Sequence, residues 1–533
     1  MAIRKLLSIC FIIILYTYRV SALNILAIVS LPLKSHYMAF QPLFQELAVR
    51  GHRVTVINNY PDSNPQPNLK YVDISLPSAR KMPVMSEFEN ISSKYLHISN
   101  YLKHFILSKN NVEGDCDNLF TNPNMRTFLS EGERFDVIFV EQFMSDCGLV
   151  LAGTMYDAPI IGITSHTLLP WAYSRLGIPF DVLSDAFYFS NVGTQPSLLK
   201  SIENYYMHLY MNTIGSWKIQ RIINDVFKRH APNASLDFEM IVRDKMKMMF
   251  VYQHFSVTGA RSLPPQLVEI AGIHIKKPKP VSRDIETFLS SAKHGAIYVS
   301  FGSNLKSSLM SEKRRQAFLD AFKKIPQKIL WKLENGSLPD GNDNILTSSW
   351  FPQLDVLCHP KVRGFISHGG MLSLSEAAYC GKPILAMPFF GDQFSNVAAI
   401  EESGLGLSMY FNEADSASLV AAINKLTSNE MQHKAERISK IFNDRPLNVM
   451  DNAIYWTEYV AKYRDVPKLP AFYTPWYRRL ILDAAIIVIL IIPIAFVFLM
   501  FKVVKTLLLL LCYRSSRVQT KAKRSDKKKQ KRL

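Results

Sequence analysis

The sequence predicts an α/β fold built from two doubly wound domains. Apolar, strand-like segments alternate with amphipathic helical segments from Asn24 onward, and the same alternation starts again at Ala296. Between the two series lies the segment 272–284, which is rich in proline and lysine and is typical of a linker between domains. Strands that alternate with helices form mostly parallel sheets covered by helices. We therefore expect one such domain on each side of the linker.

The first series starts with a β-α-β unit. Its predicted strands are Asn24–Ser30, Arg53–Ile57, Asp136–Val140 and Ile160–Thr164. Tyr37–Arg50 has helical periodicity and ends at Gly51, a residue common just past a helix. Residues 60–130 have weak periodicity, and residues 166–250 are apolar and rich in Tyr and Phe. We expect the second of these regions to be helical in part.

The second series has clearer periodicity. Its predicted strands are Ala296–Ser300, Lys328–Leu333, Val362–Ile366 and Ile384–Met387. Its predicted helices are Glu312–Ile325, Leu354–Cys358, Met371–Cys380, Ala414–Thr427 and Met431–Phe442. The alternation predicts a second parallel sheet.

The most informative stretch is residues 365–393, FISHGGMLSLSEAAYCGKPILAMPFFGDQ. The glycines after His368 let the backbone approach a ligand, and the start of the helix that follows is a natural place for phosphate. Ser373 can donate to a phosphate oxygen, and Glu376 lies on the same helical face and can accept from ribose hydroxyls. Asp392 and Gln393 follow the last strand, where ligands bind in open α/β sheets.

This pattern resembles the signature of the family 1 UDP-dependent glycosyltransferases, which include membrane-bound UDP-glucosyl and UDP-glucuronosyl transferases. The matching residues are His368, Gly370, Ser373, Glu376, Pro383, Pro388, Asp392 and Gln393. Upstream, residues 350–353 (Trp-Phe-Pro-Gln) and His359-Pro360 match a second block of the family. The resemblance implies the GT-B fold, in which two Rossmann-like domains face a cleft. Residues 23–275 would bind the acceptor and residues 285–445 the UDP-sugar.

The resemblance also implies roles for the side chains of the second domain. Trp350 would stack on uracil, and Gln353 would bond the edge of the base. His368, Ser373 and the loop at Ser303 would contact the diphosphate, while Asp392 and Gln393 would bind hydroxyls of the donated sugar. Leu372 departs from the family, because many relatives have Asn at this place.

His36 is the expected catalytic base. It follows the first strand, at the edge where the cleft should lie, and a free histidine has a pKa of about 6.5. The family's base occupies this loop. A carboxylate should hold the imidazole in the correct tautomer. Glu141 stands where relatives have Asp, and Asp146 is the alternative.

We therefore expect an inverting transfer of a hexose from UDP-glucose to a small lipophilic acceptor, of the detoxification type, with no metal and no cofactor. The sequence around residues 141–146 and 389–391 looks more like that of invertebrate members, which favour UDP-glucose. UDP-glucuronate is the alternative donor. A non-catalytic binding protein on a transferase fold is the other class of function. A homo-oligomer stays open.

The two ends of the chain predict targeting to a membrane. Residues 1–22 have the pattern of a cleaved secretory signal, and residues 483–505 are predicted to span the bilayer after a membrane-proximal segment, 446–482. The tail 506–533 is strongly basic and is expected in the cytosol. Its end resembles a lysine-based retrieval signal, so we expect a single-pass type I protein of the endoplasmic reticulum with lumenal catalytic domains. The net charge of +18 lies largely in this tail, which makes nucleic acid an unsuitable partner.

The cysteines and sequons complete the expectations. The cysteines outside the two ends are Cys116, Cys147, Cys358 and Cys380. Four cysteines are too few for a disulfide framework in a chain of this size, so Cys147, Cys358 and Cys380 are predicted to pack as small hydrophobic residues. N-glycosylation is expected at Asn90, Asn233 and Asn335.

Overall fold

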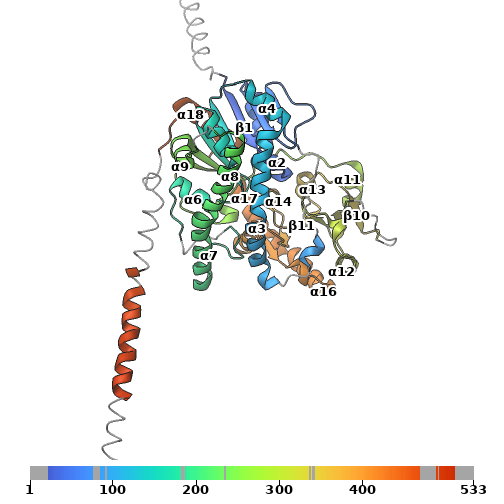
Figure 1. Cartoon of the computed structure of the whole chain (residues 1–533). Coiled ribbons are helices and arrows are strands. Elements are labelled where there is room, and N and C mark those ends of the chain that lie inside the picture. Colours follow the sequence, from blue (N-terminus) through green and yellow to red (C-terminus); the bar gives the residue numbers. More distant parts are fainter. Residues whose placement is uncertain are drawn as a thin grey trace, which may run out of the picture. The chain divides into compact units, whose positions relative to one another are not determined.

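The computed structural model describes residues 22–75, 85–89, 93–181, 185, 188–232, 236–334, 338, 342–467, 488–489 and 491–509. The chain divides into two compact units, residues 1–469 and 470–533. The first unit contains two parallel sheets, drawn in blue to green and in yellow to orange in Figure 1. The predicted α/β class and the pair of doubly wound domains are confirmed.

The first sheet has seven parallel strands in the order β3-β2-β1-β4-β5-β6-β7. Its strands are β1 (Asn24–Val29), β2 (Arg53–Asn58), β3 (Leu69–Asp73), β4 (Val137–Glu141), β5 (Ile160–Thr164), β6 (Met246–Val251) and β7 (Leu267–Glu269). Its α-helices are α2 (Lys34–Val49), α3 (Ser93–Thr121), α4 (Pro123–Ser130), α5 (Cys147–Met155), α6 (Pro170–Leu176), α7 (Leu198–Tyr210), α8 (Ser216–His230), α9 (Phe238–Met240) and α10 (Phe255–Thr258). Shorter turns of other helix types are η1 (Met85–Phe88), η2 (Met211–Gly215) and η3 (Ile241–Lys245).

The second sheet has six parallel strands in the order β10-β9-β8-β11-β12-β13. Its strands are β8 (Ala296–Ser300), β9 (Lys328–Lys332), β10 (Ile345–Ser348), β11 (Val362–Ser367), β12 (Ile384–Ala386) and β13 (Gly406–Ser408). The helices of this half are α11 (Arg283–Ser290), η4 (Ser307–Leu309), α12 (Glu312–Phe322), α13 (Gln353–Cys358), α14 (Met371–Cys380), α15 (Gln393–Ser403), η5 (Phe411–Glu413), α16 (Ser416–Leu426), α17 (Asn429–Asn443) and α18 (Val449–Tyr463).

Each sheet reverses its strand order once, between β1 and β4 in the first and between β8 and β11 in the second. A reversal of this kind leaves a crevice at the carboxyl ends of the two central strands, where ligands of open α/β sheets bind. The central strands are buried because apolar residues face the helices on both sides of the sheet. The predicted site residues follow these same strands.

Two regions differ from the sequence-based prediction. Residues 60–130 contain β3 and the long helix α3, whose weak periodicity concealed it. Helix α2 begins at Lys34 rather than Tyr37, so His36 lies in its first turn and not in a loop.

Helix α18 returns to the first half of the chain. It packs against α2, β4 and β6, although it follows the second sheet in sequence. His52 Nε2 lies 3.2 Å from Glu458 Oε1 across this contact. In Figure 1 the label of α18 stands among the blue and green elements. The first domain is therefore completed by the end of the second.

The prediction for the cysteines was wrong, because the structure pairs all four. Cys116 joins Cys147 between α3 and α5, with a Cα–Cα distance of 5.3 Å. Cys358 joins Cys380 between the ends of α13 and α14, with a Cα–Cα distance of 4.8 Å. The partners are 31 and 22 residues apart in sequence, so only the packing of their helices brings them together.

The second unit contains the helix Ile491–Leu509, which is long and apolar enough to cross a membrane by length and composition. It continues past residue 505, the predicted end of the span. Residues 1–21 of the predicted leader, residues 510–533 of the tail, and Asn90, Asn233 and Asn335 lie outside the described residues.

Replacing both Cys358 and Cys380 by serine should lower the free energy of unfolding by roughly 3 kcal/mol, because a cross-link restricts the unfolded chain. The measurement is the thermal unfolding midpoint of the wild type and the double variant. A reductant should lower the midpoint of the wild type further than that of the variant, which has only Cys116–Cys147 left to lose. Equal midpoints for the two proteins without reductant would contradict a stabilising bond.

Candidate active site

His36 and Glu141 form a buried pair at the crevice of the first sheet. His36 lies in the first turn of α2, and Glu141 is the last residue of β4. The distance from His36 Nδ1 to Glu141 Oε1 is 2.5 Å, and the two residues are 5% and 6% exposed. Burial raises the pKa of Glu141 to about 8, although His166 opposes this effect. The contact occupies Nδ1 of His36, so Nε2 is the nitrogen on the opposite side of the ring.

Asp146, the alternative partner for His36, is held by a different cation. It lies at the start of α5, and its Oδ2 accepts from Arg175 Nη2 at 2.5 Å. Arg175 also donates to Gln142, and both charged residues are buried. The geometry therefore brings Glu141, and not Asp146, to His36.

His166 joins the two halves of the first unit. It follows β5, and its Nε2 lies 3.0 Å from His36 Nε2. Its Nδ1 lies 3.1 Å from Oδ2 of Asp392, which stands at the start of α15 in the second half. Asn396 donates to the same oxygen of Asp392 at 2.7 Å. Glu141, His36, His166 and Asp392 thus form one continuous row of polar side chains.

Asp392 is ionised in this row. Burial alone would raise its pKa, but His166, Asn396 and His368 together hold the pKa below its ordinary value. Gln393, the next residue, turns its amide oxygen back to accept from the backbone N–H groups of Phe389 and Phe390, at 2.8 and 3.1 Å. That contact fixes the loop before α15.

Three predicted nucleotide ligands meet at the start of α14. Gln353 Nε2 donates to Ser373 Oγ at 3.0 Å and to Glu376 Oε2 at 2.5 Å. The other oxygen of Glu376 lies 3.3 Å from His274 Nε2, which comes from the segment after β7. Leu372, the departure from the family, packs against the apolar core.

Trp350 offers an open aromatic face. Its side chain is 56% exposed, whereas most large aromatic residues of this half are buried. Lys332 Nζ lies 5.1 Å from the ring centroid and Lys34 Nζ lies 5.5 Å from it. Burial lowers the pKa of Lys332, although Glu334 opposes the shift. A flat exposed ring beside two amines can stack on a base that carries phosphates.

His368 lies between β11 and α14, closely surrounded by glycine. A Cβ added at Gly302 would stand 2.6 Å from the imidazole, and one added at Gly370 would stand 2.4 Å from it. Gly302 also has a φ of +82°, which other residues rarely adopt. Burial lowers the pKa of His368 to about 4, against the effect of Asp392 and with that of Lys332. The imidazole is therefore neutral at neutral pH. Ser303, in the loop after β8, is exposed.

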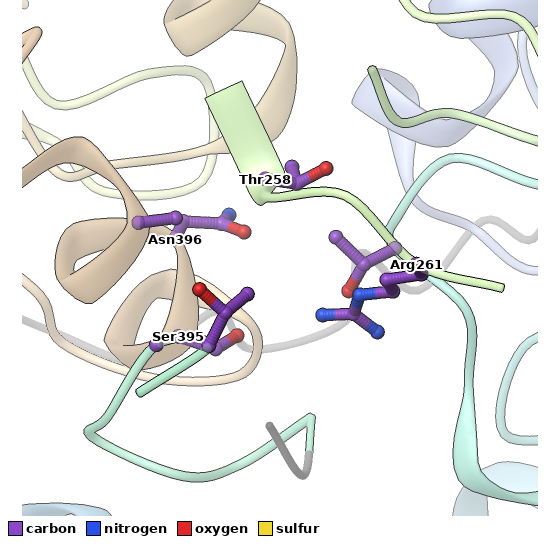
Figure 2. A pocket seen from close by; sticks show the side chains of 8 residues that line it. Thr258, Arg261, Ser395 and Asn396 are labelled. Atoms are coloured by element: carbon purple, nitrogen blue, oxygen red, sulfur yellow. The ribbon is translucent and has the colours of Figure 1, made fainter. Parts of the chain in front are cut away.

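Figure 2 shows a small polar cavity whose lining includes Asn396, the residue that donates to Asp392. Asn396 and Ser395 of α15 face Thr258 and Arg261 across it. Its volume of about 10 Å³ suits a single water molecule, so the cavity is too small for either substrate. Among the described residues, no group of three or more His, Cys, Asp or Glu side chains could hold a metal ion.

Sequence analysis missed His166, His274 and Lys332. His166 stands at the carboxyl end of β5, as His36 stands after β1, so its position held a usable signal. His274 lies in the segment interpreted as a linker, and Lys332 is the last residue of a strand. Only the tertiary fold relates these two to Glu376 and Trp350.

The family described as "UDP-glucoronosyl and UDP-glucosyl transferase" matches residues 27–522. UDP-glycosyltransferase UGT5 of Dactylopius coccus is 30% identical over 86% of this chain and 88% of its own length. UDP-glucosyltransferase 2 of the same organism is 30% identical over 84% of this chain and 86% of its own. Human UDP-glucuronosyltransferase 1A6 is 27% identical over 84% of this chain and 85% of its own length.

Solved structures share the fold. A UDP-glucosyltransferase from Polygonum tinctorium covers 83% of this chain and 99% of its own, with a TM-score of 0.54 and 14% identity. The glycotransferase of kitacinnamycin covers 82% of this chain and 98% of its own, with a TM-score of 0.54 and 17% identity. These two likenesses confirm the expected GT-B arrangement of two Rossmann-like domains.

The neutral state of His368 predicts a pH-dependent stability. The folded protein excludes a proton that the unfolded histidine binds with a pKa of 6.5, so stability should fall as pH drops from 6.5 towards about 4. His368→Gln cannot titrate and should lose less stability over this interval. The measurement is the unfolding midpoint against pH, with His433→Gln, an exposed histidine of α17, as control. Parallel curves for wild type and His368→Gln would contradict the burial of a neutral imidazole.

Proposed function

The chain belongs to the UDP-glucuronosyl and UDP-glucosyl transferase family and is a UDP-glycosyltransferase, and we propose that it transfers glucose from UDP-glucose to a hydroxyl of a small lipophilic acceptor. The contact between His36 and Glu141, joined to Asp392 by one side chain, is the observation that carries the proposal. His36, the proposed base, therefore lies one side chain away from Asp392, the proposed ligand of the hexose.

In the proposed reaction, His36 is the general base. With Glu141 on Nδ1, the lone pair of Nε2 takes the proton of the acceptor hydroxyl. The acceptor oxygen forms a bond to the anomeric carbon as the bond from that carbon to the diphosphate oxygen breaks. The electron pair leaves with UDP, and the anomeric configuration inverts. Glu141 stabilises the imidazolium that forms.

The second half supplies the donor site in this proposal. Uracil stacks on Trp350, Gln353 bonds the base, and Glu376 accepts from the ribose. Ser373, the neutral imidazole of His368, the loop at Ser303 and the N–H groups at the start of α14 carry the charge of the departing diphosphate, so the reaction needs no metal. Asp392 and Gln393 hold the hexose hydroxyls.

The donor is proposed from the relatives. The Dactylopius UDP-glucosyltransferase 2 is 30% identical, and the listed mammalian UDP-glucuronosyltransferases are 26% to 28% identical. The slightly higher identity to the glucosyltransferase favours UDP-glucose as the donor. We also propose that residues 23–467 lie in the lumen of the endoplasmic reticulum. The support is the apolar helix Ile491–Leu509 followed by a basic tail.

The test is UDP release by the full-length chain in microsomes, with UDP-glucose or UDP-glucuronate and a panel of phenols and sterols. We expect release with UDP-glucose to exceed that with UDP-glucuronate for at least one acceptor. His36→Ala should lower the rate by about 10²–10⁴-fold, the usual contribution of a general base, while UDP affinity changes little. Faster release with UDP-glucuronate would reassign the donor. No release with either donor across the panel would indicate a binding protein.

Glu141→Gln and Asp146→Asn should separate the two candidate partners of His36. Glu141→Gln should lower kcat by about 10²–10⁴-fold, because an uncharged amide cannot stabilise the imidazolium and its NH2 group can donate to Nδ1, which favours the wrong tautomer. Asp146→Asn should spare kcat of the folded protein but destabilise it by about 3–5 kcal/mol, because the charge of Arg175 stays buried without its partner. The measurements are kcat and the unfolding midpoint. Loss of kcat in Asp146→Asn, with kcat spared in Glu141→Gln, would make Asp146 the partner of His36.

A further inference from the structure

His166 occupies two places that the proposed reaction needs for its substrates. Its Nε2 stands 3.0 Å from His36 Nε2, the atom that must receive the acceptor proton. Its Nδ1 stands 3.1 Å from Asp392 Oδ2, the atom proposed to receive hexose hydroxyls. Both separations are ordinary donor–acceptor distances, so each nitrogen of His166 stands where a hydroxyl oxygen would.

The contact with His36 and the acceptor exclude each other. The Nε2 atom of a neutral imidazole has one lone pair, in the plane of the ring, and it accepts one hydrogen bond. While His166 donates to that lone pair, a hydroxyl cannot. The acceptor can approach only after the imidazole of His166 has turned away.

Of the two contacts of His166, the one with Asp392 is the stronger. The pKa of Asp392 lies below its ordinary value, so this carboxyl group is ionised, and a hydrogen bond to a carboxylate is charge-assisted.

The surroundings hold the imidazole at this place. The ring of Phe143 lies 4.7 Å from that of His166, and the ring of Tyr188 lies 5.6 Å away. Phe143 also contacts the ring of His36 at 4.6 Å. These ring contacts hold the imidazole of His166 in position beside His36 and Asp392.

We propose that His166 occupies the positions of both substrate hydroxyls when no substrate is bound. The hexose of the donor replaces His166 at Asp392, the imidazole of His166 then moves away from His36, and Nε2 of His36 becomes accessible to the acceptor. UDP alone has no hexose and does not release His166. This inference rests on the proposed function, because it needs the hexose at Asp392.

The proposal predicts that hexose binding is opposed in the wild type by the contacts it must replace. Removing His166 should therefore raise the affinity for UDP-glucose by about tenfold while the affinity for UDP stays unchanged, since one charge-assisted hydrogen bond is worth about that factor. A residue with a purely structural role would shift both affinities together. The ratio of the two affinities is thus the informative quantity.

The experiment uses the full-length chain in detergent and isothermal titration with UDP and with UDP-glucose, in the absence of acceptor. The variants are His166→Ala and His166→Ser, whose side chains cannot bridge both partners. Ser165→Ala is the matched control, because Ser165 is the buried neighbour in the same loop and lies outside the proposed machinery. Unchanged UDP affinity shows that each variant is folded.

We expect the ratio of UDP-glucose to UDP affinity to rise about tenfold in both His166 variants and to stay at the wild-type value in Ser165→Ala. A ratio that stays constant or falls in the His166 variants would overturn the inference and leave the proposed function standing, since release of UDP from UDP-glucose by the wild type tests that function separately. A wild-type protein that binds neither nucleotide would overturn both.

Discussion

The site depends on a largely buried row in which two imidazoles lie between two carboxyl groups. Glu141 and Asp392 stand at its ends, and each contacts one histidine. In surroundings of low polarity an unpaired carboxylate is costly, so the members of the row hold one another in place. Because Glu141 comes from the first sheet and Asp392 from the second half, neither domain can assemble the row alone.

The electrostatics divide the work between the two halves. Burial raises the pKa of Glu141 to about 8, so its negative charge is best supported when a cation forms beside it. The imidazolium of a general base is such a cation. In the second half, burial lowers the pKa of His368 to about 4 and keeps it an uncharged donor, while the amines of Lys332 and Lys34 lie close to Trp350. In the proposed donor site, the neutral donor would lie near the diphosphate and the positive charge near the uracil base.

Much of this could be predicted from sequence because it is local. Strands such as β1, β4, β8 and β11 are continuous apolar runs, and the polar residues after them follow from chain order. The choice between Glu141 and Asp146 could not be made, because it depends on Arg175, which is distant in sequence. The cysteine pairs and the bridge through His166 could not be predicted for the same reason. Each joins residues whose proximity exists only after the helices and both sheets have packed.

The return of α18 to the first sheet affects how the molecule can be divided. Its residues lie at the end of the chain's second half, yet its apolar face covers α2, β4 and β6. A chimera that exchanged acceptor domains at the linker 272–284 would leave the grafted sheet against a foreign helix. The natural unit of exchange is discontinuous: everything up to the linker, together with the stretch 449–463.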